Sequence, residues 1–128
     1  MDPIADLLIR IKNAQSTGCE LVELPFSKVK FAVSKILEKE GFLAKVEKRV
    51  SKNKEKLELK LKYNEKMPAI QNLKRVSKSG QRVYIKSEKI RPVRQGYGLV
   101  IISTSQGLMT GKEARKKRLG GEIICEIW

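Results

Sequence analysis

Apolar residues near the start of the chain recur at helical spacing. Asp2 and Pro3 form an N-cap followed by proline at the first helical position, and Gly18 supplies a C-terminal stop. The apolar positions between them form one stripe, which is typical of an amphipathic helix. We expect this helix to pack against the rest of the domain through Ile4, Leu7, Leu8, Ile11 and Ala14.

A short strand and a second helix are expected next. Residues 19–24 suit a strand that Pro25 ends, and Ser27 can cap a helix that stops at Gly41. The apolar face predicted for this helix consists of Val29, Ala32, Val33, Ile36 and Leu37.

Alternating apolar and polar residues then predict a β-hairpin. Residues 42–50 and 57–63 should pair across a turn at residues 51–55. The first half of the chain is therefore expected to follow the order αβαββ.

The alternation lapses over residues 64–68, where a proline closes the gap. We predict a domain boundary at this point. It would separate an N-terminal domain of residues 1–64 from a C-terminal domain of residues 65–128.

Shorter strand patterns follow the predicted boundary. Residues 70–76 and 82–86 are typical of two strands around a turn at residues 77–80, and residues 87–92 allow one helical turn at most. Residues 99–102 form an unbroken apolar run, which predicts a strand buried on both faces. A final apolar strand after a glycine pair, in residues 120–128, should lie beside that buried strand.

Small and polar residues come directly after the buried strand. They have no hydrophobic pattern, so we expect a loop with exposed hydroxyls and backbone N–H groups. Thr110 stands three residues before Glu113, which is the spacing of a capping box and predicts the start of a short basic helix. The loop consists of Ser103, Thr104, Ser105, Gln106 and Gly107, and the helix carries Lys112, Arg115, Lys116, Lys117 and Arg118.

Net charge is the strongest signal in the composition. The chain has 28 Lys and Arg residues against 14 Asp and Glu, a net charge of +14. Residues 67–128 hold 13 of the basic and 4 of the acidic residues, and residues 74–94 alone hold eight basic residues and one acid, Glu88. So large an excess favours an acidic partner such as a nucleic acid.

Several common activities are disfavoured. The chain has no histidine, the commonest general base and metal ligand. Residues 107–112 are one residue short of a phosphate-binding loop, and Gly96 and Gly98 lack the third glycine of a dinucleotide fingerprint. Cys19 and Cys125 lie far apart, so we expect two buried thiols, and we expect no metal or cofactor.

No apolar run approaches the roughly 18 residues that a membrane span needs. The acidic start of the chain, with Asp2 and Asp6, does not resemble a signal peptide. We therefore expect a cytoplasmic protein with no membrane partner.

The polar loop and the basic segments together suit RNA. Cationic side chains, led by Lys112, Arg115 and Lys116, can bind phosphates and release counterions. Small hydroxyl side chains can approach the wide, shallow RNA minor groove and bond 2′-hydroxyls and base edges. Tyr84 can stack on a base or sugar, or simply cover part of a strand. An RNA-modifying or RNA-cleaving enzyme that uses Lys and Glu, and a DNA-binding regulator, stay open as alternatives.

The motifs of the second half, and several of the first, resemble a known family. They match the eighth protein of the small ribosomal subunit, bacterial type, over essentially the whole chain. The resemblance is carried by residues 98–107, which end in Ser-Thr-Ser-Gln-Gly, and by residues 108–110, 113–115 and 120–125. Residues 2–6, 10–14 and 25–28 are also similar to the family.

The resemblance implies an α+β fold, with an α/β N-terminal domain and a mainly β C-terminal domain that carries one short basic helix. It implies a structural, non-enzymatic protein that binds the central domain of small-subunit ribosomal RNA and helps assemble the platform. The expected neighbours are the fifth and twelfth small-subunit proteins, and the protein is expected to be monomeric outside the ribosome. In bacteria such a protein can also repress its own operon by binding the messenger RNA.

The family's RNA loop corresponds to residues 103–107. The resemblance adds Tyr84 and Glu122 as supporting residues, and Lys30 as a second contact from the N-terminal domain. Gln106 departs from the family, since a basic residue often follows Ser-Thr-Ser, so one phosphate contact is in question there.

Overall fold

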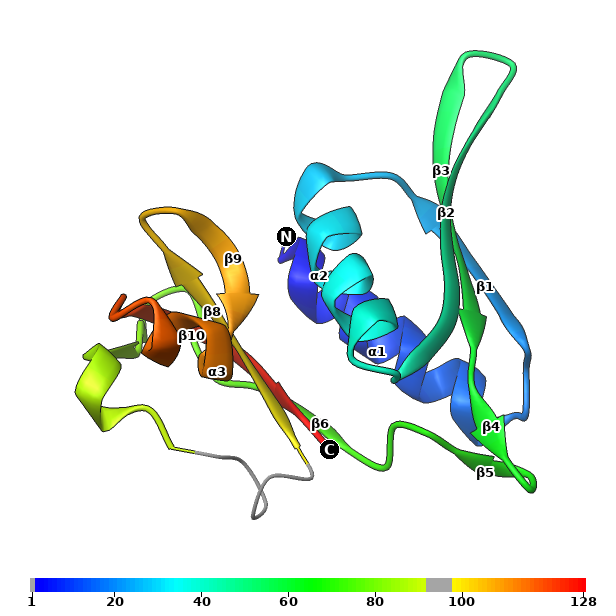
Figure 1. Cartoon of the computed structure of the whole chain (residues 1–128). Coiled ribbons are helices and arrows are strands. Elements are labelled where there is room, and N and C mark those ends of the chain that lie inside the picture. Colours follow the sequence, from blue (N-terminus) through cyan, green and yellow to red (C-terminus); the bar gives the residue numbers. More distant parts are fainter. Residues whose placement is uncertain (1, 92–97) are drawn as a thin grey trace. The chain divides into compact units, whose positions relative to one another are not determined.

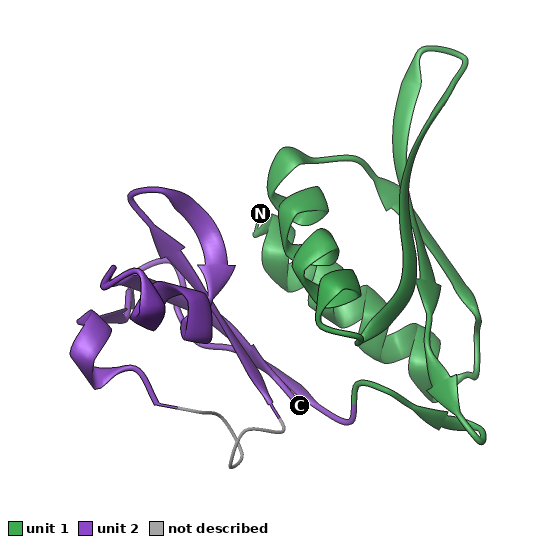
Figure 2. Cartoon of the chain, in the orientation of Figure 1, with its two compact units in different colours: residues 1–70 green, residues 71–128 purple. Residues whose placement is uncertain are grey.

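The computed structural model of the protein describes residues 2–91 and 98–128. Gly96, which the sequence analysis considered together with Gly98, lies outside the described residues. The structure is of the α+β class, as predicted, with three α-helices among the described residues and antiparallel sheets (Figure 1). It forms two compact units, residues 1–70 and 71–128 (Figure 2). The division between these units follows Ile70, a few residues beyond the boundary expected from the sequence.

The first unit has the predicted αβαββ order. Its three main strands form an antiparallel sheet in the order β1-β3-β2, and a small ribbon of two further strands follows. A tight turn with positive φ at Glu65 and Lys66 connects the two strands of that ribbon. This turn lies where the apolar and polar alternation of the sequence lapses. The elements are α1 (Pro3–Ser16), β1 (Leu21–Pro25), α2 (Lys28–Lys39), β2 (Leu43–Ser51), β3 (Lys54–Leu61), β4 (Tyr63–Asn64) and β5 (Met67–Pro68).

Both predicted helix caps are present. The Asp2 carboxylate accepts hydrogen bonds from the backbone N–H groups of Ile4 and Ala5, at 3.0 and 3.3 Å. The Ser27 hydroxyl accepts one from the N–H of Lys30 at 3.3 Å. These bonds satisfy donors that have no partner within the helix, so each helix starts where the cap stands.

The buried face of α2 differs from the predicted one. Val29 is exposed, whereas Lys30, Val33, Ser34 and Leu37 are buried. Two polar residues can take this face because their polar atoms are satisfied. The Lys30 ammonium lies 3.1 Å from Asp6 of α1, and the Ser34 hydroxyl donates to the Lys30 carbonyl at 2.7 Å.

The two cysteines have different environments. Cys125 is buried as predicted, and burial raises the pKa of its thiol to about 12. Cys19 is exposed, so the prediction of a second buried thiol was wrong. It lies in the connection between α1 and β1, where it contacts the Thr17 hydroxyl at 3.2 Å.

The second unit is built around its last strand. Strand β10 pairs with β8, as predicted, and the sheet has the order β6-β10-β8-β9, with β7 also on β10. None of the helices in residues 2–91 and 98–128 is long and apolar enough to cross a membrane. The elements are β6 (Leu73–Arg75), β7 (Tyr84–Ile85), the 3-10 helix η1 (Ser87–Lys89), β8 (Leu99–Thr104), β9 (Gly107–Thr110), α3 (Gly111–Lys116) and β10 (Gly121–Ile127).

Strands β6 and β7 do not form a hairpin with each other, although they flank the predicted turn. Both pair with β10, at Cys125 and Arg75 for β6 and at Gly121 and Ile85 for β7. They are two pieces of one interrupted edge strand. Val76, Ser77 and Val83 still form backbone hydrogen bonds with β10, and residues 78–82 loop out between them. The turn signal at residues 77–80 marks this excursion, where Lys78 and Gln81 form an isolated bridge.

One face of this sheet is covered by α3 and the segment after η1. Ala114 of α3 and Ile90 pack with Ile102 of β8 and Met109 of β9 in one buried cluster. Gly111 lets the helix approach closely, because a Cβ there would lie 2.3 Å from Cγ1 of Val100. Side chains alternate along each strand, so Ile102 and Ser103 point to opposite faces.

The ion pair between α1 and α2 should make stability depend on pH. The Lys30 hydrogen bond, assisted by Arg10, holds the pKa of Asp6 below its ordinary value. This contribution is present above the unfolded pKa of about 3.9 and is lost as the pH falls through the folded pKa. We expect Asp6→Asn to lower the free energy of unfolding by about 2 kcal/mol at pH 7, because the buried Lys30 loses its charged partner.

The measurement is urea unfolding of both proteins between pH 7 and pH 2.5, with the difference shrinking as the pH falls. The control is Glu20→Gln, which removes an exposed acid that has no ion pair among the described residues. A loss of stability for Asp6→Asn that stays constant down to the lowest pH would contradict this role of the ion pair.

Candidate nucleic-acid interface

The predicted polar loop is mostly a β-hairpin. Strand β8 continues through Ser103 and Thr104, and β9 begins at Gly107, so only Ser105 and Gln106 form the turn. The loop is shorter than predicted because hydroxyl residues, and β-branched Thr above all, adopt strand geometry readily. The end of an apolar run therefore does not mark the end of the strand.

The Thr104 side chain holds this turn together. Its hydroxyl accepts a hydrogen bond from the Gln106 N–H at 3.1 Å and donates one to the Gly107 carbonyl at 2.8 Å. Gly107 has a φ of 109°, a backbone conformation that favours glycine. The Ser105 and Gln106 side chains are exposed and make no side-chain hydrogen bond within the described part of the chain.

Strand register places Tyr84, Glu122 and Ser103 side by side. Glu122 of β10 pairs with Tyr84 of β7 on one side and with Ser103 of β8 on the other. Directly paired residues share a face of the sheet, with Cβ atoms about 5 Å apart. We call these three residues the polar row. Tyr84 is 71% exposed, and the other two are half-buried.

Glu122 is fixed by two residues that the sequence did not single out as site residues. Its carboxylate accepts hydrogen bonds from the Ser77 hydroxyl and, at 3.0 Å, from the Arg82 guanidinium. The Ser77 hydroxyl, followed by Arg82, holds the pKa of Glu122 below its ordinary value. Ser77 is fully buried and also accepts from the Val83 N–H at 3.0 Å, so the network ties both ends of the 78–82 excursion to β10.

No local pattern could have revealed this network. Ser77 and Arg82 lie 45 and 40 residues from Glu122 in the chain. Arg82 belonged to the predicted cationic region, but its specific partner depends on the strand register.

The glycine pair before β10 is required by close packing. A Cβ at Gly121 would lie 2.1 Å from the Ser103 carbonyl oxygen, and one at Gly120 would lie 2.6 Å from the Ile85 carbonyl oxygen. These glycines let β10 approach β8 and the end of β7 at the position of the polar row.

The basic helix does not adjoin the polar row. Lys112, Arg115 and Lys116 are exposed on α3, which covers the face of the sheet that carries Ile102. Ser103 of the polar row points to the opposite face. Strand β9, which was not predicted, lies between the turn and the helix.

Lys30, the predicted contact from the first unit, is largely enclosed. Its side chain is 9% exposed, and its ammonium is held by Asp6. This burial does not favour an RNA contact, which for Lys30 stays a prediction.

The two units differ in how their cations are paired. In the first unit, lysines and arginines on helices and strands form ion pairs with Asp6, Glu23, Glu38, Glu47, Glu55 and Glu58. In the second unit Arg82 forms an ion pair with Glu122. Ten basic side chains there have no ion-pair partner within the described ranges: Lys74, Lys78, Lys86, Lys89, Arg91, Lys112, Arg115, Lys116, Lys117 and Arg118.

The described side chains do not form a metal site. Within residues 2–91 and 98–128, no group of three or more Cys, Asp or Glu residues is placed to hold a metal ion. The arrangement instead combines neutral hydrogen-bonding groups, one fixed carboxylate and many uncompensated cations. Such a surface suits a polyanion that also presents hydrogen-bond donors and acceptors.

Comparison with known proteins gives a single answer. A family model described as Ribosomal protein S8 matches residues 2–128. The small ribosomal subunit protein uS8 of Mycoplasmopsis synoviae (strain 53) is 52% identical over 128 residues, which cover 99% of this chain and 97% of the relative. Proteins of the same name from Caldanaerobacter subterraneus subsp. tengcongensis and Leptospira biflexa serovar Patoc are 51% and 48% identical, with the same coverage.

These matches define a structural ribosomal protein rather than an enzyme. The chain belongs to the ribosomal protein S8 family. It is a protein of the small ribosomal subunit, which places it in the cytoplasm, on the ribosome. The alternative of an RNA-modifying or RNA-cleaving enzyme is excluded by this membership.

The close approach at Gly121 gives a test of the strand register. We expect Gly121→Ala to lower the free energy of unfolding by about 3 kcal/mol, because the new Cβ forces β10 away from β8. The matched control is Gly80→Ala, where a Cβ meets no atom within 4 Å and only the positive φ of 84° opposes the change. That control should cost about 1 kcal/mol.

Chemical denaturation of both variants measures these costs. Equal losses for the two substitutions would show that strand contact at Gly121 is not the constraint described here.

Proposed function

We propose that this protein binds small-subunit ribosomal RNA through its second unit. The observation that carries the proposal is the set of uncompensated cations in that unit, together with a neutral hairpin turn and a polar row on the same sheet. Cations without protein partners release counterions when they meet phosphates, which drives association with any RNA. Neutral groups of the same unit can then discriminate among RNA shapes.

The turn residues suit the minor groove of an RNA helix. Ser105 and Gln106 project from the end of the hairpin, and Gly107 has no side chain to obstruct a close approach. The Thr104 hydroxyl is already engaged in the turn, so its role is to hold Ser105 and Gln106 in place. Ser103 and Ser105 are the hydroxyls that can bond 2′-hydroxyls and base edges.

Glu122 adds a negative element to the site. Its ionised carboxylate can only accept hydrogen bonds, and it repels phosphate oxygens. It can accept from a 2′-hydroxyl or from the amino group of guanine, both of which face the minor groove. The carboxylate therefore favours an orientation in which the groove, and not the phosphate backbone, lies over the polar row.

The remaining members of the site have simpler roles. Tyr84, which is largely exposed, is placed to stack on a sugar or base at one end of the polar row. Lys112, Arg115 and Lys116 bind phosphates. Lys30 is retained as a predicted contact of the first unit. Gln106 has an amide side chain where the family often has a basic residue. It can therefore donate or accept a hydrogen bond without adding positive charge.

The finer features of the proposal come from the family resemblance. We propose that the RNA target lies in the central domain of small-subunit ribosomal RNA and that binding helps assemble the platform. The fifth and twelfth small-subunit proteins are the proposed neighbours, and the protein is proposed to be monomeric outside the ribosome. Repression of its own operon, through messenger RNA that mimics the ribosomal site, is part of the same proposal.

Affinity and selectivity should separate on mutation. On a central-domain RNA fragment located by footprinting, Ser105→Ala should cost about 1 to 3 kcal/mol of binding free energy, because an RNA polar group loses its partner. It should have little effect on random RNA. Arg115→Ala and Lys116→Ala should weaken both RNAs and lower the slope of log affinity against log salt by roughly one unit for each phosphate that the variant no longer binds.

Ser51→Ala is the matched control, since it removes another exposed serine hydroxyl at the end of a strand in the first unit. It should leave both affinities unchanged. Equal losses of Ser105→Ala on central-domain and random RNA would rule out the selective role of the turn.

A further inference from the structure

The sheet of the second unit separates two chemically different surfaces. One carries the polar row. The other is covered by η1 and α3, whose exposed basic residues we call the cationic face. The cationic face consists of Lys89, Arg91, Lys112, Arg115, Lys116, Lys117 and Arg118.

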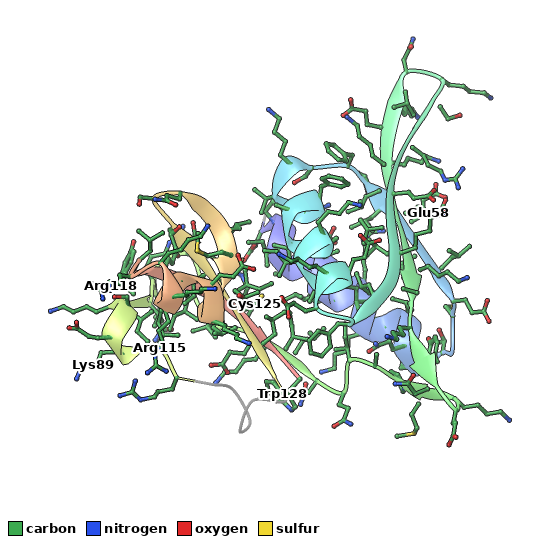
Figure 3. The ribbon with its side chains drawn as sticks, in the orientation of Figure 1. Glu58, Lys89, Arg115, Arg118, Cys125 and Trp128 are labelled. Atoms are coloured by element: carbon green, nitrogen blue, oxygen red, sulfur yellow. The ribbon has the colours of Figure 1, made fainter. Side chains whose placement is uncertain are left out.

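The two basic segments of the cationic face are held together by the core beneath them. Ile90, directly after η1, and Ala114 of α3 are buried in the same cluster with Ile102 and Met109. Figure 3 labels Lys89, Arg115 and Arg118, which all lie on the side of the unit formed by η1 and α3. The basic side chains therefore share one rigid surface, although η1 and α3 are more than twenty residues apart in the chain.

The charge of this surface is almost uncompensated. Its seven basic residues have no ion-pair partner in the described ranges, and the two acids in the same segments are Glu88 and Glu113. Arg91 uses part of its guanidinium on the Glu88 and Ile90 carbonyls, but its side chain stays exposed. A surface of this kind attracts a polyanion.

Among the described residues, this surface has no large exposed apolar side chain that could anchor a protein partner. The large hydrophobic side chains that the described residues expose are Ile9, Leu21, Val29, Val50, Met67 and Tyr84. Only Tyr84 belongs to the second unit, and it lies in the polar row on the opposite face. Stable protein interfaces depend on buried aromatic or aliphatic anchors, so a nucleic-acid backbone fits the cationic face better.

The polar row and the cationic face point in opposite directions. A helix with its side chains is about 10–12 Å across, and this thickness is added to that of the sheet between the two surfaces. One RNA helix that lies over the polar row cannot also lie flat on α3. We infer that the cationic face binds the phosphate backbone of a second RNA segment, separate from the one that the polar row and the Ser105 turn contact.

This inference rests on the proposed function and extends it. The second unit would act as a clamp between two RNA segments, with selectivity on one side and general phosphate binding on the other. The seven side chains of the cationic face end in ammonium and guanidinium groups, which suit phosphates and do not by themselves distinguish one base from another.

Hydroxyl-radical footprinting of the full chain on small-subunit ribosomal RNA tests the clamp. The wild-type protein should protect two separate segments. The variant Lys89→Ala/Arg115→Ala/Lys116→Ala should lose protection of one segment, with affinity for it reduced at least about tenfold, and keep the other. The variant Ser103→Ala/Ser105→Ala should show the reverse pattern.

The charge-matched control is Lys12→Ala/Lys28→Ala/Lys54→Ala, which removes three exposed lysines of the first unit that have no ion pair among the residues described. It should preserve both protected segments. Loss of the same nucleotides in the cationic and hydroxyl variants, unchanged protection in the cationic variant, or a single protected segment in the wild type would overturn the clamp and leave the proposed function standing. Absence of any specific protection by the wild type would overturn the proposed function itself.

A second measurement separates RNA from a protein partner. The full chain, saturated with the RNA fragment that the hydroxyl variant fails to protect, should bind a labelled generic RNA duplex in a ternary complex. The cationic variant should form that complex at least about tenfold more weakly. Protection by the cationic face that requires an added acidic ribosomal protein, with no ternary RNA complex, would contradict the inference.

Discussion

The close approach of β10 to its neighbours is the constraint on which the candidate site depends. Gly121 lies so near the Ser103 carbonyl that no side chain fits between them, and a side chain at Gly120 would also collide with the end of β7. This contact fixes the register in which Glu122 pairs with both Tyr84 and Ser103. Three residues from distant parts of the chain thereby form one row, and the Ser77 and Arg82 hydrogen bonds hold its central carboxylate in place.

The two units of the fold also differ in how far their positive charges are paired with carboxylates. In the first unit, cations and carboxylates lie beside each other on helices and strands, as in the Lys48 and Glu55 pair, so much of the local charge is neutralised. In the second unit most cations have no such partner within the described residues. The field that attracts a polyanion therefore comes mainly from the second unit, whereas ion pairs such as Asp6 with Lys30 contribute to the packing of the first.

Local signals in the sequence predicted much of the fold. The Asp2 and Ser27 caps, the hairpin of β2 and β3, and the position of β10 beside β8 all follow from spacing and turn chemistry. Long-range contacts were beyond such reasoning. Lys30 is buried only because Asp6 of another helix faces it, and β6 and β7 meet β10 instead of each other. The turn near Ser105 could be predicted because its signal is local in the sequence. The contacts of Ser77 and Arg82 with Glu122 could not, because they join residues far apart in the chain.

The Ser105 turn and the polar row carry no cation, and this leads to one decisive comparison. The affinity of the full chain should be measured by calorimetry for its central-domain RNA helix and for the same helix with 2′-deoxy sugars at the protected nucleotides. If hydroxyls in the minor groove are the groups that are read, the deoxy helix should bind at least about tenfold more weakly, while its salt dependence stays the same. Equal affinity for the two helices would contradict minor-groove recognition and leave only the attraction between cations and phosphates.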